Sequence, residues 1–183
     1  MTLIKTRARG LKLDDNFAFT GTVSGAGGVT MADQWRLTGA YDVPNSTTTI
    51  TGWSQVSGRG FGALGSSMTQ SSGVFTFPST GIYLIMSNAY IYRSSASCDF
   101  AGILLQTSTD SGSNFLTASE SYGNVDNGAN EHSEATCSFQ FDVTNTSTHK
   151  VQFRSSASDN NACRFGGGNS NQTHATFIRL GDT

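Results

Sequence analysis

The sequence contains few charged residues and no long apolar run. Asp, Glu, Lys and Arg make up only 13% of the 183 residues, against about a quarter in an average soluble domain. The formal net charge of −2 does not indicate a nucleic-acid partner, which a strongly basic domain would. No segment approaches the roughly 18 apolar residues that a membrane-spanning helix needs, so we expect no membrane insertion.

Cysteine is also scarce, with three residues and no C-x-x-C motif, so we expect no zinc site. Cys137 shares strand parity with Phe139 and Phe141, which predicts a buried free thiol. Cys98 and Cys163 lie near predicted loops and could pair. The first residues lack the apolar segment of a signal peptide, which predicts synthesis in a cytoplasm and release by assembly or lysis. That compartment favours free thiols at Cys98 and Cys163.

The titratable residues form no recognisable catalytic pattern. The histidines are far apart and each neighbours a predicted loop: His132, His149 and His174. The acidic pairs Asp14/Asp15 and Glu131/Glu134 lie in polar turns, where nothing indicates the two facing carboxylates of a glycosidase. Four residues with side-chain oxygens could supply calcium ligands: Asp126, Asn127, Asn130 and Glu131. They lack the ordered acidic spacing of a calcium loop, which favours a solvated turn. We expect no enzyme, metal or cofactor.

Strand-like segments recur at the spacing of an all-β sandwich, and no segment shows convincing helical periodicity. The predicted strands are residues 34–38, 47–53, 73–77, 82–93, 100–107, 115–121, 135–143, 150–155 and 175–180. Residues 159–171 form a predicted loop that is long enough to be functional.

The predicted strand 82–93 is apolar on both faces, unlike a strand with one solvated face. One face carries Ile82, Leu84, Met86, Tyr90 and Tyr92. The other carries Tyr83, Ile85, Ala89 and Ile91. One face can fill the sandwich core, and the other needs a second partner, which a trimer axis would supply.

Residues 1–28 differ from the body at 29–183 and predict a separate docking arm. Their basic residues precede the first acid, Asp14, and are Lys5, Arg7, Arg9 and Lys12. Phe17 and Phe19 form a short apolar stripe, and residues 25–28 form a glycine-rich hinge. Such a stripe cannot bury itself, so we expect the arm to dock on the body or on another chain.

Residues 73–85 read Gly-Val-Phe-Thr-Phe-Pro-Ser-Thr-Gly-Ile-Tyr-Leu-Ile and predict a hairpin, with Pro78 and Gly81 in its turn. This motif resembles the signature of the complement globular head and tumour-necrosis-factor (TNF) superfamily. The closing segment 175–181, which contains Phe177, is similar to the final strand of that family. The resemblance covers residues 33–183 and implies an antiparallel jelly-roll sandwich that forms a homotrimer, with both termini at its base. The collagen-like stalk of animal members is missing, which argues against a complement role.

A second resemblance covers the two ends of the chain. Residues 11–25 resemble leaders of structural proteins from tailed bacteriophages, particularly phages of marine bacteria, and residues 177–183 are similar to the ends of the same proteins. The resemblance implies a virion structural protein whose residues 1–28 dock on another virion protein. It carries over no catalytic residue.

Two predicted loops, residues 122–131 and 159–171, are rich in amide side chains that suit glycan recognition. Their candidate ligand residues are Tyr122, Asn124, Asn127, Asn160, Asn161 and Arg164. Trp53 is a further aromatic candidate, although the residues alone favour a core Trp53 and asparagines that merely suit turns. The preferred function is a trimeric fibre or fibre-tip module that attaches to a host-surface glycan. The alternative is a trimeric capsid decoration protein.

Overall fold

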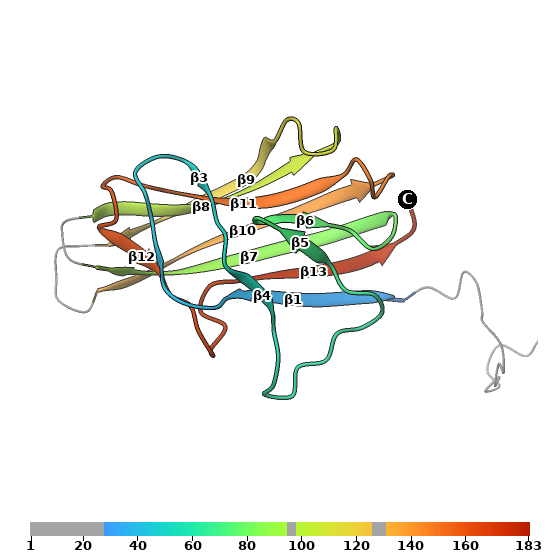
Figure 1. Cartoon of the computed structure of the whole chain (residues 1–183), viewed down its shortest axis with the longest axis horizontal. Coiled ribbons are helices and arrows are strands. Elements are labelled where there is room, and N and C mark those ends of the chain that lie inside the picture. The colour runs from blue at the N-terminus through green and yellow to red at the C-terminus, as the bar shows by residue number, and fades with distance from the viewer. Residues whose placement is uncertain (1–27, 95–97, 126–130) are drawn as a thin grey trace, which may run out of the picture.

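The computed structural model describes residues 28–94, 98–125 and 131–183. These residues form an all-β antiparallel sandwich of two sheets (Figure 1). The predicted arm residues Lys5, Arg7, Arg9, Lys12, Phe17 and Phe19 lie outside the described residues, as do Asp126, Asn127 and Asn130. In the described part of the chain, no helix is long and apolar enough to cross a membrane.

The first sheet has seven strands. They are β1 (Met31–Leu37), β2 (Tyr41–Asp42), β4 (Trp53–Gln55), β7 (Gly81–Arg93), β10 (His132–Val143), β12 (Cys163–Phe165) and β13 (His174–Gly181). The order is β2-β12-β7-β13-β1-β4, and β10 also pairs with β7. The long strand β7 therefore lies between β10 on one side and β13 and β12 on the other.

The second sheet has six strands. They are β3 (Thr48–Thr49), β5 (Thr69–Ser71), β6 (Val74–Thr76), β8 (Cys98–Ser108), β9 (Leu116–Val125) and β11 (Lys150–Ala157). The order is β5-β6-β11-β8-β9, and β3 pairs with β11. The predicted strand at residues 47–53 differs from this result. It divides into β3 and β4, because residues 50–52 between them are not part of a strand.

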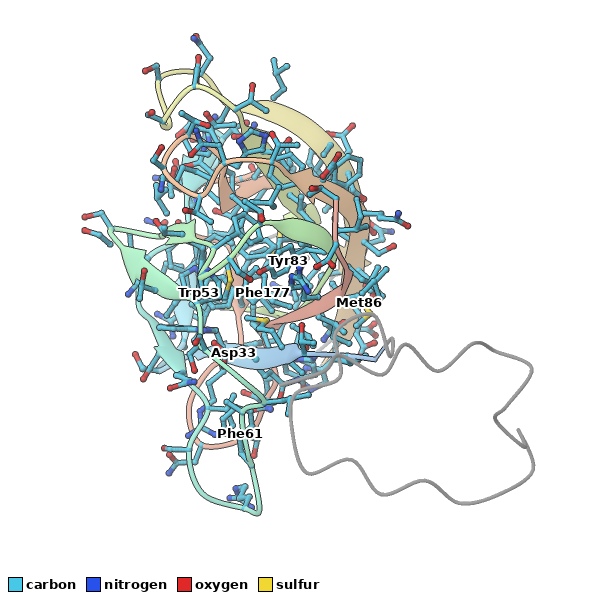
Figure 2. The ribbon with its side chains drawn as sticks, turned by 90° about the vertical axis from the view of Figure 1, so that its right-hand side faces the viewer. Asp33, Trp53, Phe61, Tyr83, Met86 and Phe177 are labelled. Carbon is cyan, nitrogen blue, oxygen red and sulfur yellow. A yellow bond between two sulfur atoms is a disulfide. The ribbon has the colours of Figure 1, made fainter. Side chains whose placement is uncertain are left out.

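Strand β7 confirms the two-faced pattern predicted for residues 82–93. Its core-facing residues are fully buried between the sheets: Tyr83, Ile85, Ala89 and Ile91. The alternate residues point away from the core and are partly exposed: Ile82, Leu84, Met86, Asn88, Tyr90 and Tyr92. Figure 2 shows Tyr83, Phe177 and Trp53 between the sheets and Met86 on the opposite side of the first sheet.

Aromatic rings fill the centre of the core around Phe75 of β6. The ring centroid of Phe75 lies 5.2 Å from Phe177, 5.4 Å from Trp35, 5.8 Å from Phe153 and 5.9 Å from Trp53. These residues come from both sheets, so their edge-to-face and tilted contacts hold the layers together. Trp53 is 4% exposed and is a core residue, which removes it from the candidate ligand residues.

The predicted hairpin at residues 73–85 is wrong in its pairing. Strand β6 pairs with β5 and β11 in the second sheet, whereas β7 belongs to the first. The turn at Pro78 therefore carries the chain from one sheet to the other. The rings of Phe77 and Tyr83, 4.7 Å apart, pack inside this crossing. Gly81 has a φ of 142°, and a Cβ there would lie 2.4 Å from Arg179 Nε, so the crossing requires glycine.

The two long predicted loops are also shorter than expected. Strand β9 continues to Val125, which places Tyr122 and Asn124 in a strand. The region 159–171 is interrupted by β12, whose register with β7 places Arg164 opposite Tyr92. These segments form strands because they pair with neighbouring strands, β9 with β8 and β12 with β7. No local sequence signal indicated this pairing.

Cys98 and Cys163 form a disulfide, which corrects the expectation of free thiols. The first residue of β8 and the first residue of β12 lie at the same end of the sandwich, with their Cα atoms 5.8 Å apart, a spacing that suits a disulfide.

Cys137 is a buried free cysteine, as predicted. Burial raises the pKa of the Cys137 thiol, which keeps it protonated and unreactive.

Replacing Cys98 and Cys163 together by Ser should lower the free energy of unfolding by about 4 kcal/mol, because the crosslink closes a loop of 65 residues. Denaturant titration with and without reductant measures this change. Thiol titration of the unreduced, denatured protein should find one thiol per chain, and a value of three would contradict the pairing. Cys137→Ser is the matched control for removing a thiol without removing the crosslink.

Candidate functional site

The first candidate surface is the face of the first sheet that points away from the core. Its centre is an apolar row made of Ile82, Leu84 and Met86 on β7 with Ile178 and Leu180 on β13. Ile178 lies opposite Leu84 in the β7–β13 register, so the two strands form one continuous patch. Leu180 is 44% exposed. An apolar patch rimmed by polar residues marks an interaction surface.

Strand β10 borders the apolar row with exposed polar side chains. At one end of the row, the Tyr90 hydroxyl lies 2.7 Å from His132 Nδ1, and the two rings stack with centroids 5.1 Å apart. Tyr92 packs against the same pair. The face therefore changes from aliphatic to aromatic along β7.

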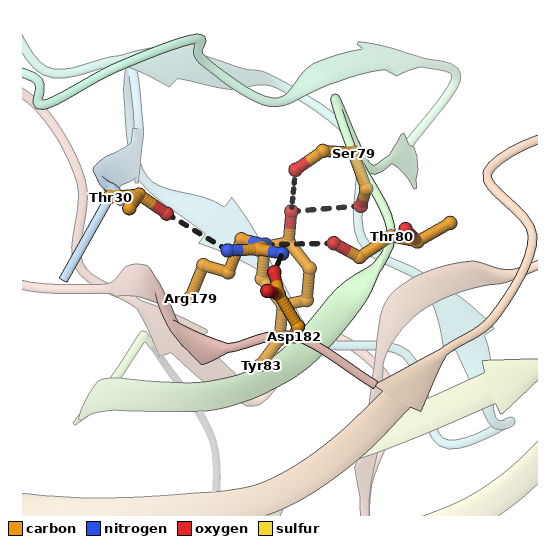
Figure 3. Close-up of polar contacts among 6 residues, drawn as sticks. All are labelled: Thr30, Ser79, Thr80, Tyr83, Arg179 and Asp182. Atoms are coloured by element: carbon orange, nitrogen blue, oxygen red, sulfur yellow. Dashed lines mark hydrogen bonds and ion pairs between the residues drawn. The ribbon is translucent and has the colours of Figure 1, made fainter. Parts of the chain in front are cut away.

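The two ends of the described chain meet at one end of the sandwich, which we call the base (Figure 3). Arg179 Nη1 donates to Thr30 Oγ1 at 3.0 Å, and Arg179 Nε donates to the Thr80 carbonyl at 2.7 Å. Arg179 also forms an ion pair with Asp182. Beside this cluster, Tyr83 and Ser79 are hydrogen bonded. The base is thus the place where the first and last described residues lie together.

Strands β8 and β12 begin, and β9 ends, at the opposite end of the sandwich, which we call the far end (Figure 1). The predicted ligand residues Tyr122 and Asn124 lie near the end of β9. The Tyr122 ring packs edge-on against Phe100, with centroids 5.5 Å apart, and both remain exposed at 45% and 40%. Gly102 makes this possible, since a Cβ there would lie 2.2 Å from the Tyr122 ring. Burial and then the Glu120 carboxylate raise the pKa of Tyr122.

The remaining candidates are arranged around β2. Arg164 forms an ion pair with Asp42. The backbone N–H of Asn161 donates to the Val43 carbonyl at 2.9 Å. Asn160 is exposed in the same turn, and Asn124 is exposed on β9. The Ser158 amide donates to the Phe100 carbonyl at 3.0 Å, which links this group to the Tyr122 side. The second half of the predicted loop, residues 166–171, contacts β1 instead.

A groove that the sequence did not indicate lies beside β1. It has a volume of about 430 Å³ and is lined by residues from β1, the loop after β4 and the loop before β13: Gln34, Arg36, Val56, Gly58, Arg59, Gly60, Phe61, Ser170 and Asn171. The only local signal was the glycine-rich stretch around Arg59. Figure 2 shows Phe61 in the loop below Asp33.

The buried carboxylate of Asp33 holds the loop that forms one wall of this groove. Asp33 is 2% exposed. Its Oδ1 accepts from the backbone N–H of Gln34 and from Gln55 Nε2. Its Oδ2 accepts from Trp35 Nε1 and from the backbone N–H of Met68. All four distances are 2.9 Å. Since Gln55 and Met68 border residues 56–67, one side chain fixes both ends of this loop.

The chemistry of these surfaces suits binding. No group of three His, Cys, Asp or Glu residues close enough to hold a metal ion occurs within residues 28–94, 98–125 and 131–183. The surfaces offer an apolar face, exposed rings, amides and two arginines beside the groove.

Asp33→Ala should lower the free energy of unfolding by about 2–4 kcal/mol, because four donors lose their acceptor and one of them, the Met68 backbone N–H, is buried. Denaturant titration measures the change. Asp142→Ala, which alters an exposed residue of β10, should change stability by less than about 0.5 kcal/mol. Equal effects of the two substitutions would contradict the structural role of Asp33.

No protein-family model matches this sequence, and no curated protein matches it. Solved structures with the same fold do. The murine APRIL structure at pH 8.5 aligns with a TM-score of 0.56 and 12% identity over 82% of this chain and 98% of that one. The Eiger TNF structure from S. frugiperda aligns with a TM-score of 0.59 and 14% identity over 84% and 94%. At these identities the similarity shows the fold alone: the described body is a TNF-like jelly roll.

Proposed function

We propose that this protein is a homotrimeric, non-catalytic module of a bacteriophage virion that attaches to a host-surface glycan. The observation that carries the proposal is the apolar row on the outward face of the first sheet. The row is continuous across β7 and β13, and its residues Leu84 and Met86 are partly exposed. The phage context rests on the resemblance of residues 11–25 and 177–183.

Burying the apolar row against other copies explains why β7 is apolar on both faces. Its core-facing side is filled by Tyr83 and Ile85, and both are fully buried. Its outward side exposes Leu84 and Met86 in part, and removing such apolar surface from water favours association. The TNF-like fold and the resemblance to trimeric globular heads favour a threefold arrangement.

The two ends of the sandwich would have different functions, docking at the base and ligand binding at the far end. Thr30 is bonded to Arg179 at the base, so the predicted docking arm, residues 1–28, would fix the base to another virion protein. The far end, with its exposed Phe100–Tyr122 pair, would then point outward. Loops and strand ends on a rigid sandwich are the usual place for binding residues.

The far end suits a neutral glycan. Arg164 is paired with Asp42, so this arginine is not available as a free cation for an anionic ligand. Exposed rings can stack on sugar faces, and asparagine amides can bond to hydroxyl groups. Three copies in one trimer would convert weak single sites into useful avidity.

Leu84→Asp should dissociate the trimer into folded monomers, because a carboxylate in the apolar interface would be buried without a partner. Light scattering at micromolar concentration measures the mass, and circular dichroism reports folding. Leu116→Asp is the matched control, since Leu116 is 75% exposed on β9 in the second sheet. A monomeric wild type, or a Leu84→Asp protein that stays trimeric, would contradict the proposed interface.

A triple variant with Asn160→Ala, Asn161→Gly and Arg164→Ala should lose binding to the host glycan by at least about tenfold in avidity, while it remains a trimer. Glycine is chosen at position 161 because Asn161 has a φ of 58°, which glycine adopts freely. Host-cell and neutral-glycan array binding measure the effect, with Leu116→Asp as control. Undiminished binding would place the site elsewhere, and a wild type that binds no host surface would favour capsid decoration.

A further inference from the structure

The groove beside β1 has the features of a second binding site, separate from the far end. Its volume of about 430 Å³ lies within the range of roughly 300–1,000 Å³ that is common for ligand sites. One wall is the loop after β4, the other is the loop before β13, and β1 forms the floor. Asp33 fixes the first wall through Gln55 and Met68.

Two arginines converge in this groove: Arg36 from the β1 floor and Arg59 from the first wall. Arg36 Nη1 donates to the Asn169 carbonyl at 2.9 Å, and Arg59 Nε donates to the same oxygen at 3.1 Å. Among the described residues, neither has an Asp or Glu partner within 4 Å. Two neighbouring guanidinium groups repel one another, so a bound anion would lower the energy of the pair.

The backbone holds Arg59 in a conformation that costs energy. Its φ is 53°, a region that residues other than glycine seldom adopt. Gly58 and Gly60 on either side also have positive φ values, of 72° and 78°, and the Phe61 amide donates to the Gly58 carbonyl at 3.0 Å. Strained residues in a structured turn cluster at binding sites, and here the turn sets the Arg59 side chain at the groove.

The rest of the lining suits a sugar. Asn171 Nδ2 donates to Gln34 Oε1 at 2.6 Å, and Gln34 Nε2 donates to Thr176 Oγ1 at 2.9 Å, so the amides are already oriented. Phe61 adds an aromatic surface. Guanidinium groups bind carboxylate and sulfate through paired hydrogen bonds.

We propose that this groove binds an acidic sugar unit of a polysaccharide, with Arg36 and Arg59 on its carboxylate or sulfate group and Gln34, Asn171 and Phe61 on its ring. This site goes beyond the proposed attachment site, because it takes an anionic ligand and involves none of the far-end residues. Its charge also distinguishes it from the neutral ligand expected at the far end.

The test measures binding of the full chain, in its native assembly, to a uronic-acid tetrasaccharide by titration calorimetry. The neutral control is the methyl ester of the same oligosaccharide, and a second arm uses a sulfated tetrasaccharide to tell carboxylate from sulfate recognition. We expect an acidic oligosaccharide to bind and the methyl ester not to bind. Raising the salt concentration from 50 to about 300 mM should weaken binding, because salt screens the charges.

Two variants test the arginines with little risk to the fold. Arg59→Gly removes the charge at a backbone conformation that glycine prefers, and Arg36→Gln removes the charge but keeps a polar, hydrogen-bonding side chain. Each should weaken binding by about tenfold or more. Arg59→Lys should weaken it less than Arg59→Gly, because it keeps the charge but loses the paired geometry. Arg154→Gln, which removes a charge from β11 in the second sheet, should leave binding unchanged.

The proposal would be overturned by no binding of either acidic tetrasaccharide at millimolar concentration, by equal binding of the methyl ester, or by unchanged binding of Arg36→Gln and Arg59→Gly. Competition by acetate or sulfate ion alone at the same concentration as the oligosaccharide would also overturn it, since the ring contacts would then contribute nothing. Loss of host attachment in the far-end triple variant bears on the proposed function and leaves this result unaffected.

Discussion

The arrangement of the β1 edge depends on the buried carboxylate of Asp33. It accepts four hydrogen bonds from donors in β1, in β4 and at Met68, and no cation among the described residues lies within ion-pair distance of it. A buried carboxylate is expensive to desolvate, and only a full set of donors offsets that cost. One side chain therefore couples the packing of Trp35 in the core to the shape of a surface loop and of the groove that this loop forms.

The two faces of the first sheet lie in different environments, as the side chains of β7 show. Side chains of β7 alternate between a dry aromatic core and an apolar surface, so the sheet is a shared wall between the subunit interior and the proposed interface. The far end and the groove are both outside the apolar row on β7. The groove is nevertheless close to this row, because its lining residue Gln34 donates to Thr176, which lies opposite Met86. Binding in the groove and association therefore involve neighbouring residues of the same sheet.

Much of the fold could be predicted from the sequence because it depends on period-two alternation. The alternation at residues 82–93 and the closing strand that contains Phe177 required only local pattern. The crossing at Pro78, the pairing of Cys98 with Cys163 and the strand around Arg164 could not be read in the same way. Each depends on which distant segments become neighbours, and 65 residues separate the two cysteines.

The candidate site was less predictable than the fold. Tyr122 and the turn at Asn160 and Asn161 lie at one end, but their loops are shorter than the composition of these segments indicates. Arg36 and Arg59 were missed because their relation arises only when β1 and two loops come together, and the sequence shows them merely as isolated basic residues 23 positions apart.

The Cys98–Cys163 bond also changes what a single break in the polypeptide can do. The strands β8, β9, β10 and β11 all lie between the two cysteines, so a protease that cuts any one connection among them leaves both pieces covalently attached. The cut ends remain at high effective concentration and keep their partners in both sheets. The protein would thus tolerate nicks in this half of the chain without shedding fragments.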